Sequence, residues 1–490
     1  MRATRFVGAS ALFFLFFATT ASAVSLDPRG IGQALVYPYY TVNKGQDTLV
    51  SIVNSGDAGK AVEMRFREGY NGRVVLQFVL FLSPHDVWTA SLSSIADDGG
   101  VLLRTSDTSC TDPAIPAAGV AFRSADYDGT GIVPADGGPT SITRTREGFF
   151  EFIAVDDIVA GSPTDVAIAH TNGDAPACET IPAAWPSDDG VVPTATIYGS
   201  AAIVNVGQGT FFPYNADAIA GFTSTPLSPY VDGPYPHGIS FLDANSSDVV
   251  VGVATAYVPD NQGRPLPLDY ASGVDAVSAV FMADRIYNEY IVAASLGANT
   301  DWVVTLPTKS FYTDPVYGSS VPAAPFDATF ANGGAGVPTH GSIYDREEGF
   351  SDFGACNGLC PPTLTSDSLS YVVNVLPVQN VAVVPALVSG VFGSTLAPFP
   401  ISAFADDGQI VLRLDLPGHQ LPGGIDFNGD EITLAGLPVA GFMSYNVINT
   451  NAQPGLLANY SGLFRHRSTT SCFGDVSGCT AASPTGVAGE

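Results

Sequence analysis

Basic residues are scarce in this 490-residue chain, and their scarcity excludes several classes of partner. Lys and Arg together number 19 against 47 Asp and Glu, which gives a formal net charge of −28. Such a charge repels nucleic acid and anionic lipid headgroups. We therefore expect no nucleic-acid partner and no basic substrate-binding face.

Charged residues of either sign are also few, at 13% of the chain. Helical bundles normally carry more Glu, Lys and Arg on their exposed faces. Apolar residues nevertheless reach 46%, which excludes a disordered polyanion. Valine-rich runs interrupted by many of the 52 Gly and 36 Pro are typical of strands joined by turns.

Motifs of nucleophilic and metal-dependent hydrolysis are missing from the sequence. Neither Gly-x-Ser-x-Gly nor His-Glu-x-x-His occurs, and no two of the six histidines have metal-ligand spacing. We expect these histidines, His419 and His466 among them, to be hydrogen-bonded surface or loop residues.

Residues 1–23 have the pattern of a secretory signal peptide. Arg2 and Arg5 precede an apolar run that is shorter than the ~20 residues of a membrane span. The small residues Ala21-Ser22-Ala23 then fit a signal-peptidase site. We expect an exported protein of the periplasm, cell surface or extracellular space, with no transmembrane segment after cleavage.

The six cysteines predict three disulfides in an oxidising compartment. Proximity in sequence favours Cys356–Cys360 and Cys472–Cys479, which leaves Cys110–Cys178. The alternative for Cys356 and Cys360 is half of a zinc site, for which a second ligand pair is missing.

The alternation of apolar and turn residues predicts an all-β fold. We expect β-sandwich domains with long disulfide-pinned loop insertions and at most one or two short helices. The expected regions are a signal peptide (1–23), an N-terminal β-sandwich (24–222), a loop-rich middle region (223–369) with a helix at 274–293, a C-terminal β-rich region (370–467) and a small polar tail (468–490).

The densest charged cluster contains Asp345, Glu347 and Glu348. Two carboxyl groups flanking a glycosidic bond can hydrolyse it, so these acids are the catalytic candidates. The alternative is a structural ion pair, because Arg346 lies within the same run.

Two acidic segments are calcium candidates. Asp426, Asn428 and Asp430 place oxygen ligands at alternate positions around a glycine. Asp126 and Asp128 form the second candidate, which a third acid, Asp136, would close. The alternative for both segments is a set of side-chain-stabilised turns in acidic surface loops.

Aromatic residues offer a third kind of site. Tyr37, Tyr39 and Tyr40 surround Pro38 and would form a stacking platform for a ligand such as a sugar. The alternative is that these rings belong to the core, since aromatic residues at strand spacing are usually buried.

Six segments resemble a family of exported, β-rich bacterial envelope or secreted proteins with no assigned activity. The resemblance implies a cell-envelope or extracellular location and carries over no catalytic residue. The segments are Thr48–Asn54, Val62–Glu68, Leu82–Trp88, Asp301–Lys309, Ile343–Glu348 and Gly462–His466.

These features together favour a non-enzymatic secreted or cell-surface protein with a binding or envelope-structural role. We expect its partner to be an extracellular polymer or an envelope protein, with calcium as the one candidate cofactor. The alternative is a secreted, carboxylate-dependent glycoside hydrolase.

Overall fold

A computed structural model describes most of the chain between residues 23 and 481. The residues outside the description are 1–22, 97–98, 172–175, 182–190, 228–238, 248–251, 319, 355–366, 381–388, 450–452, 454–455, 457 and 482–490. The signal peptide, Cys356 and Cys360 therefore lie outside the described residues.

The described chain is built mainly of antiparallel strands, which confirms the all-β fold class. Its helices are more numerous than the one or two expected: α1 (Ala125–Asp128), α2 (Pro163–Ile168), α3 (Gly273–Phe281) and α4 (Lys309–Thr313). Three of them contain four to six residues, too few for a helical repeat to be visible in a sequence.

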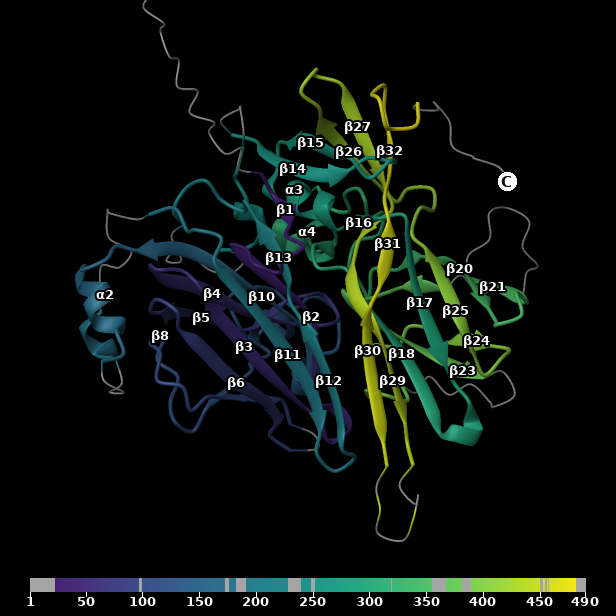
Figure 1. Cartoon of the computed structure of the whole chain (residues 1–490), viewed down its shortest axis with the longest axis horizontal. Helices are drawn as coiled ribbons and strands as arrows, with labels where there is room; N and C mark the ends of the chain where they lie inside the picture. The colour runs from purple at the N-terminus through teal and green to yellow at the C-terminus, as the bar shows by residue number, and fades with distance from the viewer. Residues whose placement is uncertain are drawn as a thin grey trace, which may run out of the picture.

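Two sheets pack face to face in the N-terminal half (Figure 1). Their strands are β1 (Ser25–Leu26), β2 (Ala34–Thr41), β3 (Asp47–Asn54), β4 (Gly59–Glu68), β5 (Val74–Leu82), β6 (Val87–Ser94), β7 (Val101–Arg104), β8 (Thr111–Asp112), β9 (Val120–Ala121), β10 (Glu147–Ile158), β11 (Ile197–Asn205), β12 (Thr210–Asn215) and β13 (Asp217–Ala220). One sheet has the order β1-β13-β2-β10-β4-β5-β8, and the other has the order β12-β11-β3-β6-β7-β9. We call the second the six-stranded sheet.

The core between these sheets follows from strand alternation. Met64 and Phe66 point inward from β4, and they share one apolar cluster with Ile52 and Trp88 of the six-stranded sheet. All four side chains are fully buried. Because successive side chains of a strand point to opposite faces, the other face of the six-stranded sheet is turned toward solvent.

The remaining strands form sheets of the second half of the molecule. They are β14 (Ala254–Pro259), β15 (Pro265–Tyr270), β16 (Met282–Ala283), β17 (Arg285–Ile291), β18 (Ala298–Thr305), β19 (Val337–Pro338), β20 (His340–Tyr344), β21 (Phe350–Gly354), β22 (Ser368–Leu369), β23 (Val373–Asn380), β24 (Ile401–Ala403), β25 (Asp407–Arg413), β26 (Gln420–Ile425), β27 (Glu431–Ala435), β28 (Leu437–Pro438), β29 (Ala440–Val447), β30 (Tyr460–Arg465), β31 (Arg467–Thr469) and β32 (Ser471–Phe473). The sheets β21-β20-β25-β17-β31 and β24-β23-β18-β29-β30 combine strands from either side of residue 370, so that position does not separate two sheets.

The helix expected at 274–293 is wrong over its second half. Helix α3 ends at Phe281, and β17 follows as a strand. Ile286, Asn288 and Tyr290 are buried while their neighbours are more exposed, which is the two-residue period of a strand. The sequence pattern merged a short helix with the strand that follows it.

Two of the expected disulfides are present. Cys110 is bonded to Cys178, and Cys472 is bonded to Cys479. The second bond closes a small loop beside β32, so the start of the tail is part of a sheet. In the described part of the chain, no helix combines the length and apolar character required to cross a membrane.

Candidate ligand groove

The solvent-facing side of the six-stranded sheet carries an open groove of about 670 Å³. Five of its residues lie directly opposite one another on five neighbouring strands: Pro213, Ala202, Leu49, Ser91 and Arg104. We call these five residues the groove row. Neighbouring strands lie 4.7–4.9 Å apart, so the row spans about 19 Å.

Small side chains explain why this face is hollow. Ala202 and Ser91 flank Leu49 within the groove row, and Ser51 lies opposite both Ser200 and Thr89 in the next row. None of these side chains except Leu49 is large enough to fill the space above the sheet.

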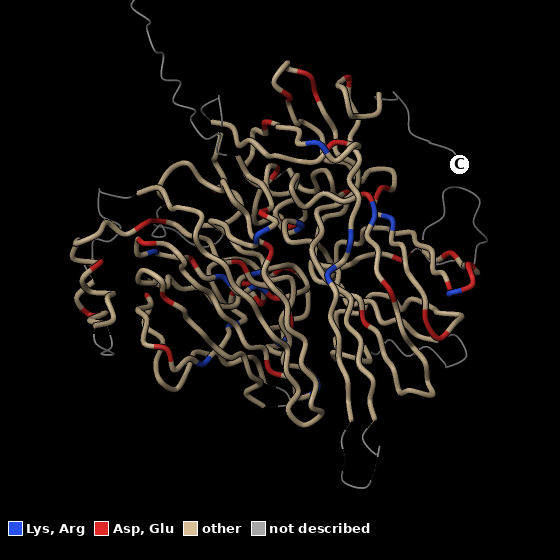
Figure 2. Tube along the Cα trace, viewed as in Figure 1, with Lys and Arg blue, Asp and Glu red and all other residues tan. Residues whose placement is uncertain are grey.

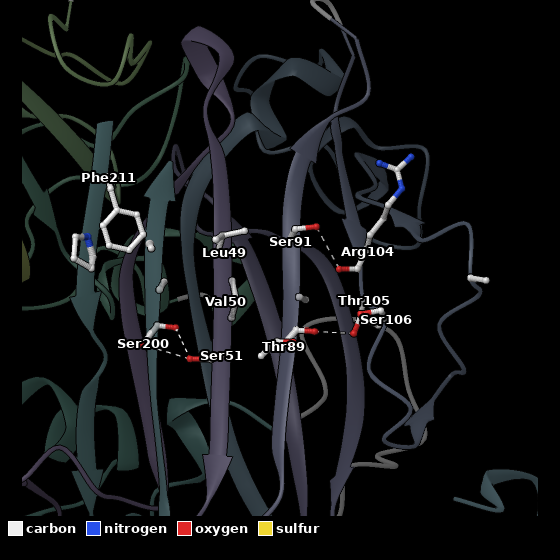
Figure 3. A pocket seen from close by; sticks show the side chains of 15 residues that line it. Leu49, Val50, Ser51, Thr89, Ser91, Arg104, Thr105, Ser106, Ser200 and Phe211 are labelled. Carbon is white, nitrogen blue, oxygen red and sulfur yellow. Dashed lines mark hydrogen bonds between the residues drawn. The ribbon is translucent and has the colours of Figure 1, made fainter. Parts of the chain in front are cut away.

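Six of the residues that line the groove carry a side-chain hydroxyl: Ser51, Thr89, Ser91, Thr105, Ser106 and Ser200. Ser51 Oγ donates to the carbonyl oxygen of Ser200 and lies 3.1 Å from Ser200 Oγ. Thr105 Oγ1 donates to the carbonyl oxygen of Thr89 at 2.7 Å. Figure 3 shows two separate groups: Ser51 with Ser200 on β3 and β11, and Thr105, which follows β7, with Thr89 on β6.

The two ends of the groove differ in chemistry. Phe211 lies at one end with 52% of its surface exposed, and Arg104 lies exposed at the other end (Figure 3). Among the described residues, the Arg104 guanidinium has no carboxylate within ion-pairing distance. None of the fifteen lining residues is acidic, although the chain contains 47 acids.

Many charged residues lie inside the molecule, away from this groove. In Figure 2, blue and red segments lie together near the middle of the trace. Arg144 is wholly buried between Glu68 and Asp136, and Arg73 is buried against Asp314. Both arginines also contact the second half of the chain, Arg73 through Asp314 and Arg144 through the ring of Phe330.

The catalytic candidates Asp345, Glu347 and Glu348 lie in the turn between β20 and β21. Asp345 Oδ1 accepts hydrogen bonds from the backbone N–H groups of Glu347 and Gly349, each at 2.8 Å. Both glutamates are exposed, and none of the three acids lines the groove. Their arrangement is that of a stabilised hairpin turn.

The first calcium candidate lies in the turn between β26 and β27. Asp426 Oδ1 accepts from the backbone N–H groups of Asn428 and Asp430, and Asp426 Oδ2 accepts from Asn428 Nδ2. Both Asp426 oxygens therefore stabilise the turn.

The three acids of the second calcium candidate each contact a different partner, and two of these partners are arginines. Asp126 lies 3.3 Å from Arg123, and Asp136 pairs with Arg144 at 2.5 Å. Asp128 accepts from the backbone and side chain of Thr130. Across the described ranges, no three His, Cys, Asp or Glu side chains are placed to hold a metal ion. Calcium binding therefore stays a prediction from sequence.

The tyrosine platform expected at Tyr37, Tyr39 and Tyr40 is not a surface. All three rings are fully buried in one apolar cluster, in which Tyr37 stacks on Phe150 and Tyr39 packs against Phe392 and Phe442 of the second half. Burial raises the pKa of each phenol well above its usual value. The alternative interpretation, that these rings belong to the core, is the one that the structure supports.

One histidine lies in an arrangement that sequence reasoning missed. His170 Nε2 lies 3.2 Å from Thr108 Oγ1, and His170 Nδ1 lies 3.9 Å from Asp86 Oδ2. A nucleophilic triad needs a hydrogen bond between base and carboxylate, and 3.9 Å is too long for one. Asp86 Oδ2 instead accepts from Ser83 N–H and Ser109 Oγ.

Two of the histidines expected at the surface or in loops do lie in connecting segments, where His419 is buried and His466 is partly buried. His419 is 1% exposed and lies 3.0 Å from the carbonyl oxygen of Leu414. His466 packs on Trp302 with ring centroids 4.6 Å apart, and burial lowers its pKa to about 3. Both histidines are hydrogen-bonded, as the sequence analysis expected.

Comparison with known proteins finds no matching family model, no matching curated protein and no matching solved structure. The resemblance to exported bacterial proteins therefore stays a prediction, and the groove has to be interpreted from its own chemistry.

Proposed function

We propose that this is a secreted or cell-surface binding protein without enzymatic activity, and that its ligand is an extracellular polymer lying in the groove. The observation that carries this proposal is an open, acid-free groove in a chain with a net charge of −28. Concave surfaces with a few convergent polar groups are the usual places where proteins bind ligands.

Export is supported by the signal-like residues 1–23 and by the two disulfides. Disulfides persist in oxidising compartments such as the periplasm and the extracellular space. The bond between Cys110 and Cys178 joins segments 68 residues apart. It lies in the same half of the molecule as the groove.

The contacts of the three candidate acids do not favour the alternative of a glycoside hydrolase. Asp345 is occupied by turn hydrogen bonds, and Glu347 and Glu348 are exposed outside the groove. Substituting both glutamates by glutamine and screening glycans for turnover checks this directly. Loss of a measured hydrolysis in the double variant would restore the alternative.

The binding proposal is tested with a variant that fills the groove. Thr89 is exposed on β6, so Thr89→Trp adds bulk above the sheet without disturbing the core. Ser351→Trp, at an exposed position on β21 outside the groove, is the matched control. We expect the wild type and Ser351→Trp to bind purified wall polysaccharides or matrix proteins, and Thr89→Trp to bind at least tenfold more weakly. Equal binding by all three proteins would contradict the proposal.

A further inference from the structure

We infer that the ligand of the groove is a neutral polysaccharide, held across the strands with one sugar ring against Phe211 and another hydrogen-bonded by Arg104. This inference rests on the proposed binding function and names the class of polymer. It follows from the direction of the groove, its two ends, its hydroxyl lining and its charge.

The direction of the groove excludes recognition of a peptide by strand addition. That mode requires an unpaired sheet edge, where main-chain groups are free. The groove runs over the face of the sheet, and its floor is backbone already paired within the sheet. At the β12 edge, Ser461 Oγ of β30 accepts from Phe211 N–H at 3.1 Å and donates to the Phe211 carbonyl oxygen at 2.9 Å.

Those two hydrogen bonds also hold the Phe211 backbone in place while its ring stays half exposed. An aromatic ring presents a flat apolar surface, and the C–H face of a sugar ring is a flat apolar surface of similar size. A backbone fixed before binding does not have to be ordered when a ligand packs on the ring that it carries. Phe211 therefore supplies an exposed stacking surface on a fixed backbone.

The hydroxyl lining suits a ligand that both donates and accepts hydrogen bonds. Ser and Thr hydroxyls have one donor and two acceptor positions, and sugar hydroxyls have the same. The Ser51 hydroxyl is hydrogen-bonded to Ser200, and the Thr105 hydroxyl is hydrogen-bonded to the carbonyl oxygen of Thr89. Within the described chain, the side-chain hydroxyls of Thr89 and Ser106 have no hydrogen bond to protein, and both residues are exposed in the groove.

Charge decides between neutral and charged polymers. A polyanion is repelled by the net charge of −28. A polycation finds no carboxylate among the fifteen lining residues. No acid among the described residues pairs with Arg104, and its planar guanidinium can donate to two adjacent hydroxyls of a neutral chain.

Affinity electrophoresis of the mature protein tests this inference. The gels contain a soluble β-glucan, mannan or xylan as neutral polymers, and polygalacturonate or polylysine as charged polymers. We expect retardation by at least one neutral polymer. Phe211→Ala should weaken that binding about tenfold and Phe211→Tyr should preserve it, because tyrosine keeps the flat aromatic face that alanine lacks. Arg104→Gln should also weaken it, whereas Phe350→Ala, at an exposed ring on β21, should not.

The possible results separate the two proposals. Binding to a charged polymer or to a protein alone, blocked by Thr89→Trp, overturns the neutral polysaccharide and leaves the binding function standing. Binding to a neutral polymer that Phe211→Ala and Arg104→Gln leave unchanged also overturns the inference. Failure to bind any polymer or protein tested overturns both proposals.

Discussion

Arg67 and Glu151 form an ion pair whose two side chains are completely removed from solvent. Arg67 Nη2 lies 2.6 Å from Glu151 Oε1, and Arg67 Nη1 donates to the carbonyl oxygen of Gly72 at 2.8 Å. The pair lies on neighbouring strands of the seven-stranded sheet, on the face that the second half of the chain covers. Charged residues thus contribute to how the two halves fit together.

Removing one partner of this pair should destabilise the fold strongly. Glu151→Gln leaves the Arg67 cation buried without its counter-charge, which costs about 3–5 kcal/mol of unfolding free energy. Chemical denaturation followed by circular dichroism measures the loss. The control is Glu289→Gln. Glu289 lies 3.5 Å from Arg467 in an ion pair that is mostly exposed, so its loss should lower the unfolding free energy by less than about 1 kcal/mol. Equal effects of both variants would contradict this account.

Glu63 should make the protein less stable as the pH rises toward neutrality. Burial raises the Glu63 pKa to about 7, and Glu151 and Asp243 add to the shift while Arg65 opposes it. The folded state therefore holds a proton that the unfolded state has released, so stability falls between pH 4.5 and about pH 7, by about 3 kcal/mol. Melting temperatures of wild type and Glu63→Gln across this range measure the effect. The melting temperature of Glu63→Gln should fall less steeply with pH than that of the wild type. Parallel curves for the two proteins would refute the raised pKa of Glu63.

His466 should stay neutral throughout the physiological range. Its pKa of about 3 results from burial, and its two ring nitrogens lie 3.1 Å from Asn288 Nδ2 and from the carbonyl oxygen of Val303. Because the folded pKa is below the unfolded value, this site loses stability as the pH falls below 6.5 toward 3. Imidazole NMR shifts, assigned with His466→Gln, should be constant from pH 8 to pH 5. A titration midpoint near 6.5 would contradict the lowered pKa of His466.

The two described disulfides should differ in their contribution to stability. The Cys110–Cys178 bond closes a loop of 68 residues and the Cys472–Cys479 bond closes one of 7. Loop-closure entropy predicts losses of about 4.4 and about 2.4 kcal/mol when each pair is replaced by alanine. Denaturation of the two double variants checks the order. A larger loss from the second pair would contradict the entropic explanation.

Some strand positions in the N-terminal half could be predicted because apolar and β-branched runs there are bounded by turn residues. The apolar and β-branched runs at 47–54 and 74–82 have the length and composition of strands, and they form β3 and β5. The burial of both faces of β4 could not be predicted in the same way. Glu63, Arg65 and Arg67 alternate with apolar residues, as on a half-exposed strand, yet they are buried by segments more than a hundred residues away.

The groove escaped prediction for a related reason. Leu49, Ser51 and Thr89 are ordinary residues for the solvent side of a strand, and nothing local indicates that they line one hollow. Their alignment depends on the register between strands, which long-range pairing sets. The acidic turns at Asp345 and Asp426 were visible in the sequence, but turn geometry and ligand geometry use the same residue types.

The most direct test of the central claim places a fluorescent reporter at each of two exposed rings. Phe211→Trp puts an indole at the end of the groove, and Phe350→Trp puts one on β21 outside it. We predict that a bound neutral polysaccharide shifts the tryptophan emission of the first variant to shorter wavelength and leaves the second unchanged. An unchanged spectrum of Phe211→Trp under conditions where the polysaccharide is bound would show that the ligand lies elsewhere.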